Sequence, residues 1–497
     1  MLNIGATTST SKEISPLKAR AWIAGRGLGL DRSRVMAEPV LRDTRYLETY
    51  GCYPRRSVVE LESSGKLDAS LTRFKLLRLV FSAEESKQTF EEETAEQSWS
   101  ISFKEPTRLE LSFDLKPGYY LLFASGERGR FALPLVIDDK ETRADVVVIR
   151  PVFTQWSYHA EGFYFNDYRS QADRLLMAVG YKGGRAGRLM EGALRRTARS
   201  LRLPKVNFPY SPFPAHASIN LGGFYRRNNR WDRLMWDETF GRLEGLWVDE
   251  LISGMPVFAL LERNGVPYHV YTDADLHNRN PELERYSVLI FSGQEGITRD
   301  YYSALESLQS RGRTSFLLWG VQAFGYRQLD YDARSGELSY VATRGRQGMW
   351  GDELTGRQPD WVDESRLFGF HFPEPQSATW RYDKPYSRIV VHNPEHPVVR
   401  ASAHSKSYHF QVRDRAGETH TGLTWAGGEV QERIAPEADV IAYLDDDREI
   451  IGIGEYRNTI IFSPTYLPAF FAYQSEEHPE IEAWFMAALS YLTRTNA

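Results

Sequence analysis

Residues 250–325 constrain the fold of this chain most, because helical and strand-like apolar patterns alternate there over short distances. Apolar residues recur at helical spacing after Trp247, and Asn264-Gly265 supplies a left-handed helix end. A second amphipathic helix is expected to end at Arg311-Gly312. The strands that we expect are residues 268–272, 286–291 and 314–319. Their short connections predict a mainly parallel sheet wound by right-handed crossovers.

The chain of 497 residues is also too long for one hydrophobic core, since single cores stop growing near about 250–300 residues. Between residues 55 and 136, short apolar runs alternate with turn signals, which predicts an antiparallel β-sandwich. The run Val146-Val147-Val148-Ile149 is typical of a strand buried on both faces. We predict the following organisation: a flexible N-terminus at 1–14, a β-sandwich domain at 15–140, and an α/β domain at 141–497 with a partly β insertion at 330–440.

Beyond the insertion, residues 450–463 are expected to form a hairpin and residues 480–492 a closing helix. The net charge of −5 is spread along the chain, which argues against a nucleic-acid partner. No run of 18 uncharged apolar residues occurs, so a cytoplasmic protein outside the membrane is expected. Cys52 is the single cysteine, which excludes a disulfide framework and a thiolate zinc site. Any metal must therefore be bound by oxygen or nitrogen ligands.

In parallel sheets, ligands bind beyond the carboxyl ends of the strands, where loops and helix N-termini converge. The loops at this edge are 273–278, 292–298 and 320–327. They contain no dinucleotide or phosphate-binding glycine motif, no nucleophile elbow and no cysteine, so the usual nucleotide, serine-hydrolase and Cys-His-Glu mechanisms are excluded. Glu295 remains as a candidate cation ligand or general base, with helix capping as the alternative. Asp273 and Asp275 are expected to bond loop amides or to cap a helix.

Aromatic residues form 13% of the chain, which fits either packed cores or a site lined by phenols. They are concentrated in the stretch 154–164, which follows the strand at 146–149 and leaves the same edge of the sheet. His159 and Glu161 lie two residues apart there, so an extended chain would direct both to one face.

Several segments, in this order, resemble the family of the N,N-dimethylformamidase large subunit. The segments are Tyr53-Pro54-Arg55-Arg56, Pro117-Gly118-Tyr119-Tyr120, Thr154-Gln155-Trp156-Ser157-Tyr158-His159, Phe208-Pro209-Tyr210, Leu261-Glu262-Arg263-Asn264-Gly265, Thr272-Asp273-Ala274-Asp275-Leu276-His277 and Ser292-Gly293-Gln294-Glu295. The resemblance extends over about residues 50–325. It implies a β-sandwich followed by a glutamine-amidotransferase-like three-layer α/β domain.

The resemblance implies hydrolysis of a C–N amide bond at a mononuclear ferric iron site. Its ligands would be Tyr158, Tyr210 and Glu295, and phenolates and a carboxylate are hard donors that suit ferric iron. Such an ion would lower the pKa of a water molecule and polarise the amide carbonyl. A small amide is then the expected substrate, and the expected assembly is a homo-oligomer, alone or with a small accessory subunit.

The chain departs from the family pattern beside Glu295. Gln294 stands where the family has a histidine, and Gly296-Ile297-Thr298 replaces an aromatic pair. The catalytic candidates are therefore Gln294, in the place of that histidine, and His159 and His277, which could replace the lost histidine as proton shuttles. Three hypotheses stay open: a metal-dependent amide hydrolase, a non-catalytic relative that acts in binding or assembly, and a carbohydrate-active enzyme with an aromatic cleft and paired acids.

Overall fold

The computed structural model describes the elements that surround the strand-end loops. The described residues are 41–43, 52–63, 73–82, 87–93, 108–125, 130–154, 255–294, 296–319, 324, 327–334, 337–343, 363–371, 388–402, 408–409, 411–413, 419–421, 432–433, 435–444, 447–462 and 479–495. Within them, no helix is both long and apolar enough to cross a membrane.

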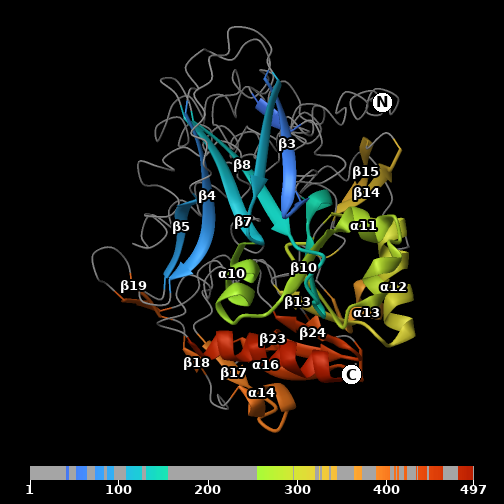
Figure 1. The fold of residues 1–497 in the computed structure, drawn as a ribbon. Helices are drawn as coiled ribbons and strands as arrows, with labels where there is room; N and C mark the ends of the chain where they lie inside the picture. The colour runs from blue at the N-terminus through green and yellow to red at the C-terminus, as the bar shows by residue number, and fades with distance from the viewer. Residues whose placement is uncertain are drawn as a thin grey trace, which may run out of the picture.

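The N-terminal strands form two sheets, coloured blue to cyan in Figure 1. One sheet has the order β1 (Leu41–Asp43), β3 (Arg56–Ser63), β6 (Arg108–Asp114). The other has the order β2 (Cys52–Pro54), β8 (Arg130–Asp138), β7 (Gly118–Ser125), β4 (Arg73–Ser82), β5 (Lys87–Glu93). All pairs are antiparallel except β2 with β8. The expected short antiparallel strands are thus confirmed, whereas the sandwich and the boundary near residue 140 stay predictions.

A sheet of nine strands forms the centre of the remaining chain. Its order is β10 (Tyr268–Thr272), β9 (Val146–Arg150), β11 (Val288–Ser292), β13 (Ser315–Trp319), β24 (Thr459–Phe462), β23 (Asp447–Tyr456), β22 (Asp439–Leu444), β17 (Arg388–Val391), β18 (Tyr408–His409). The pairs from β10 to β24 are parallel, and those from β24 to β18 are antiparallel.

The sheet is therefore mixed, whereas the sequence predicted a mainly parallel one. The hairpin expected at 450–463 forms as β23 and β24, and because β24 pairs with β13 it converts the sheet from parallel to antiparallel. Strands β17 and β18 lie inside the expected insertion 330–440 and extend the antiparallel half. The sequence pattern of these short strands did not reveal their partners, since pairing depends on residues far away in the chain.

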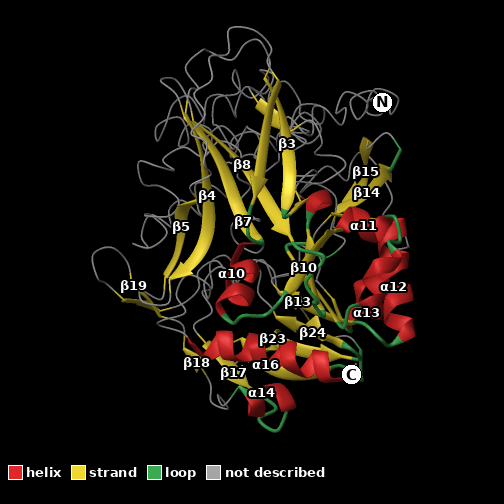
Figure 2. Cartoon of the chain, in the orientation of Figure 1, coloured by secondary structure: helices red, strands yellow, loops and turns green. Residues whose placement is uncertain are grey.

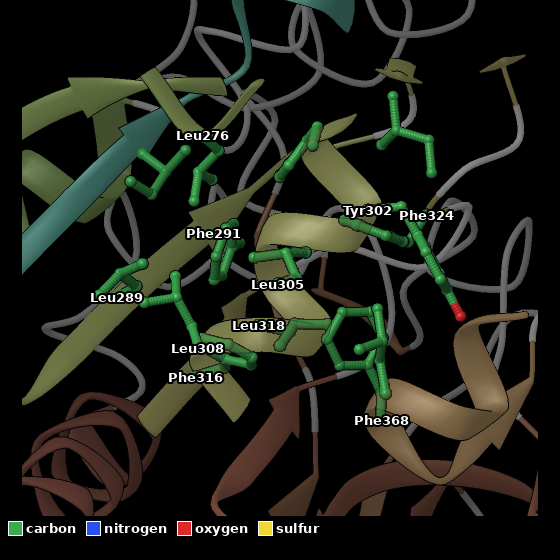
Figure 3. Packing of buried hydrophobic residues seen from close by; sticks show 14 of the residues in the cluster. Leu276, Leu289, Phe291, Tyr302, Leu305, Leu308, Phe316, Leu318, Phe324 and Phe368 are labelled. Carbon is green, nitrogen blue, oxygen red and sulfur yellow. The ribbon is translucent and has the colours of Figure 1, made fainter. Parts of the chain in front are cut away.

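Helices cover both faces of the parallel strands (Figure 2). α12 (Arg299–Arg311) packs on one face through a cluster that includes Leu305 and Leu308 with Phe291, Phe316 and Leu318 (Figure 3). The expected closing helix, α16 (Pro479–Thr495), lies on the other face. There the ring of Phe485 contacts Trp319 with centroids 4.6 Å apart. Burial on both faces explains the continuous apolar runs in these strands.

The first expected helix is α10 (Met255–Arg263), which connects the two parts of the molecule. Its Glu262 accepts a hydrogen bond from the hydroxyl of Tyr268 at 2.9 Å and lies 3.8 Å from the guanidinium of Arg78 on β4. At the outer edge of β10, the backbone of Val270 bonds to Asp138, the last residue of β8, and to Lys140, which lies two residues further on. Side chains at the end of the N-terminal sheet thus form hydrogen bonds with the backbone of Val270 on an edge strand of the nine-stranded sheet.

Candidate functional site

The candidate site lies at the carboxyl ends of β10, β9 and β11, which are neighbours in the sheet. β10 leads directly into α11 (Asp273–His277), and β9 into a short helical turn at 152–154. β11 leads through residues 293–295 into β12 (Gly296–Thr298), which directly precedes α12. The sequence predicted these loops but not β12, which pairs with β14 (Arg327–Asp332) and so connects the loop after β11 with the loop after β13.

Gln294 is a fully buried side chain that joins two neighbouring strands at this edge. Its amide nitrogen donates to the backbone oxygen of Ile149 at 2.8 Å, and its amide oxygen accepts from the hydroxyl of Tyr301 at 3.4 Å. Gly293, in the left-handed region at φ 68°, lies in the turn that follows β11. Gln294 thus ties this turn to residues 149–154, the last two residues of the strand and the turn that follows, which we call the end of β9.

Gly296 is the second connection between this turn and β9. Its backbone N–H donates to the hydroxyl oxygen of Thr154 at 2.9 Å. A Cβ atom at this position would lie 2.9 Å from backbone atoms of both Phe153 and Thr154, so only glycine allows this close approach. Gln294 and Gly296, the two residues that flank Glu295 in the sequence, are therefore both bonded to the end of β9.

Asp273 is the third connection to β9. Its Oδ2 accepts a hydrogen bond from the backbone N–H of Phe153 at 2.8 Å, and the side chain is fully buried. Its other oxygen, Oδ1, has no hydrogen-bond partner among the described residues. Burial raises the pKa of Asp273 well above its usual range, although the backbone N–H groups of Phe153, Ala274 and Val152 act in the opposite direction.

Asp275 has the capping role that the sequence predicted. Its carboxylate accepts from the backbone N–H of Thr272 at 2.8 Å, and its own N–H donates to the Thr272 hydroxyl at 3.3 Å. This reciprocal pair is a capping box at the start of α11. The short polar turn expected at 273–276 is therefore one turn of helix, stabilised by its own side chains.

His277 lies at the end of α11, half-buried beside the start of α12. Its Nδ1 is 2.8 Å from the hydroxyl of Thr298, and its ring contacts Phe153 and Tyr331 edge-on with centroids 6.1 and 5.1 Å apart. Burial lowers the pKa of His277, with a smaller opposing effect from the charges of Asp300 and Asp330. The imidazole is therefore neutral near pH 7 and can accept or pass on a proton.

The remaining predicted site residues lie outside the described residues. These are Tyr158, His159, Tyr210 and Glu295, so the convergence of the three metal ligands stays a prediction. Thr154 and Tyr301 were not expected to contribute, yet both bond to residues that flank Glu295. The sequence signal for Thr154 was a polar residue four positions after the apolar strand, in the region where parallel sheets place functional side chains.

A family model described as N,N-dimethylformamidase beta subunit-like, C-terminal, matches residues 72–444 of the chain. A search of curated proteins gives no match.

Two solved structures are also similar to the chain. One, described as a GMP synthase subunit from Thermoplasma acidophilum, is 9% identical, with 48% of this chain and 89% of that chain covered and a TM-score of 0.26. The other, an exo-β-1,4-mannosidase from Opitutaceae bacterium strain TAV5, is 13% identical, with 51% and 32% covered and a TM-score of 0.27. TM-scores at this level support no argument about fold or chemistry, so the family match alone bears on function.

Proposed function

The chain belongs to the N,N-dimethylformamidase beta subunit-like family, and from this membership we propose that it hydrolyses the C–N bond of a small amide. We further propose that the reaction takes place at a mononuclear ferric site at the carboxyl ends of β9 and β11. Tyr158, Tyr210 and Glu295 would hold the ion, as the resemblance implies. Two anionic phenolates and a carboxylate are oxygen donors of the kind that ferric iron prefers.

One observation carries the location of this site. Both neighbours of Glu295 are bonded to the end of β9, Gln294 through its side chain and Gly296 through its backbone. Tyr158 follows Thr154, the last described residue of that end, by four positions in the sequence. The described residues on both sides of Glu295 thus bond to the segment that leads toward Tyr158, and this contact supports the proposed location.

The residues of this chain contribute positioning and proton transfer in the proposal. Bound ferric iron would act as a Lewis acid, polarising the amide carbonyl and making a water molecule more acidic. A neutral imidazole such as His277 or His159 would accept the proton of the attacking water and deliver it to the departing amine nitrogen. Gln294 cannot transfer protons in this way, because a carboxamide does not titrate near neutral pH.

The test is metal analysis and visible spectroscopy of untagged protein, with N,N-dimethylformamide as the probe amide. We expect about one iron per chain and a phenolate-to-iron charge-transfer band that fades in Tyr210→Phe. Tyr302→Phe is the matched control, because the Tyr302 hydroxyl is bonded to the backbone oxygen of Asp363, away from the strand-end turn. It should lower stability and leave the band unchanged.

The non-catalytic hypothesis is favoured by a different observation. The amide of Gln294 is bonded at both ends, to Ile149 and Tyr301, so this position retains a structural contact without the proton carrier of the family. A folded preparation that binds no iron when refolded with ferrous or ferric salt, and that leaves the amide intact, would support a binding or assembly role.

A further inference from the structure

We propose that Asp273 is a positioning residue, whose carboxylate fixes the end of β9 and thereby sets where the segment that carries Tyr158 leaves the sheet. This inference rests on the proposed function, because it concerns the placement of a proposed iron ligand. The hydrogen bond from Phe153 to Asp273 joins residues 120 positions apart in the sequence, so only the folded sheet creates it.

The parallel pairing of β10 with β9 explains why Asp273 can reach this backbone. Thr272, the last residue of β10, is in register with Arg150, the last residue of β9. The residue that follows β10, Asp273, therefore stands beside the point where the chain leaves β9. The backbone N–H of Phe153, in the turn that follows β9, donates to its carboxylate at 2.8 Å.

The helix that contains Asp273 does not need this carboxylate for its own cap. Thr272 and Asp275 already form the capping box of α11. Taking a carboxylate out of water is unfavourable, and one oxygen of Asp273 is bonded by no residue that the structure describes. A serine or an asparagine could also accept a backbone hydrogen bond at the start of a helix, without the burial of a charged group. The contact that distinguishes Asp273 from Asp275 is therefore the one with the end of β9.

Three side-chain hydrogen bonds fix that end. Asp273 bonds the N–H of Phe153, Gln294 bonds the oxygen of Ile149, and Thr154 bonds the N–H of Gly296. Removal of the Asp273 bond leaves β9 fixed in the sheet but releases the residues directly before 155. A displacement of about 1 Å in a reacting group is enough to cost about 10²-fold in rate.

The experiment compares Asp273→Ala, Asp273→Asn and the control Asp275→Ala in the full-length protein loaded with iron. Asparagine keeps an oxygen acceptor for Phe153, whereas alanine does not. We expect Asp273→Ala to shift the charge-transfer band per bound iron and to lower kcat at least about tenfold, with KM changed less than about threefold. Asp273→Asn should restore the band, and Asp275→Ala should lower Tm without shifting it. If Asp273→Ala does not fold, Asp273→Ser replaces it, because serine is shorter and lacks the carboxylate oxygen that bonds Phe153.

Hydrogen–deuterium exchange at residues 152–154 separates the failure of this inference from the failure of the proposed function. If the wild type binds no iron, the proposed function is wrong. Faster exchange in Asp273→Ala than in Asp273→Asn and Asp275→Ala would still show that Asp273 fixes the end of β9. Equal exchange in all four proteins would show that it does not. An unchanged band in Asp273→Ala, or the same shift in Asp275→Ala, overturns the positioning role.

Discussion

The side-chain amide of Gln294 donates a hydrogen bond to the backbone oxygen of Ile149, at 2.8 Å, and so connects the turn after β11 with the neighbouring strand β9. Both groups are buried, so the bond cannot be replaced by water without opening the sheet edge. This contact and the bond between Gly296 and Thr154 fix the backbone of Gln294 and Gly296 to the end of the neighbouring strand β9.

Gln294→Leu should destabilise the protein by about 1–3 kcal/mol, because it leaves a buried carbonyl without a donor. Gln309→Leu is the matched control, since Gln309 is also buried and its amide is bonded to a backbone oxygen, that of Leu367. Urea denaturation should show similar losses in both variants. Only Gln294→Leu should reduce bound iron, and equal iron contents would contradict the scaffold role of Gln294.

Gly296→Ala should destabilise the protein by about 1–3 kcal/mol and weaken iron binding, because its Cβ would meet the backbone of Phe153 and Thr154 at 2.9 Å. Neither strand can move without breaking the hydrogen bond between Gly296 and Thr154. Gly265→Ala provides the comparison, since its φ of +62° is strained but no atom lies within 4 Å of the new Cβ. Gly265→Ala should lower the free energy of unfolding without changing iron binding. A loss of bound iron in Gly265→Ala would show that iron content follows stability alone.

His277→Gln should make stability less dependent on pH on the acid side. Because burial lowers the folded-state pKa of His277, the stability that this residue contributes is present above its unfolded pKa of about 6.5 and is lost as pH falls through the lower folded value. Melting curves between about pH 8 and about pH 5 should show a smaller drop in Tm for the variant. A drop of the same size in both proteins would mean that His277 is not buried as neutral imidazole.

Asp273→Asn should change stability with the opposite pH dependence. The folded-state pKa of Asp273 is raised, so its contribution to stability is fully present below its unfolded pKa of about 3.9 and is lost as pH rises through the folded value. The Tm of the variant minus that of the wild type should therefore increase as pH rises. A difference that is constant with pH would show that the carboxyl titrates alike in the folded and unfolded chain.

Cys52→Ser should leave any amide hydrolysis unchanged. The thiol lies on β2 of the N-terminal sheet, where burial raises its pKa, and its sulfur accepts a long contact of 3.6 Å from the guanidinium of Arg150. A thiol in this state is a poor nucleophile. Loss of turnover without a loss of Tm would move the active site toward the N-terminal sheet.

The sequence by itself determined the local elements near the site, because their signals are local. Helical spacing and Asn264-Gly265 predicted α10, and continuous apolar runs predicted β9, β10 and β13 at nearly their observed positions. Strand β11 begins at Val288, two residues later than the sequence predicted. Its pairing with β9 starts only at Val288, so the apolar Tyr286 lies before the strand. The capping role of Asp275 could also be predicted from the sequence, because a capping box involves residues only three positions apart.

Tertiary structure alone decided which segments meet. No pattern in the sequence indicates that β24 pairs with β13, that β12 pairs with β14, or that Phe153 donates to Asp273, because each contact joins residues far apart in the chain. For the same reason Gly296 resembled a simple departure from the family pattern, whereas the structure shows a backbone approach that excludes any Cβ. Short-range periodicity fixes elements, and the packing of the sheet fixes their neighbours.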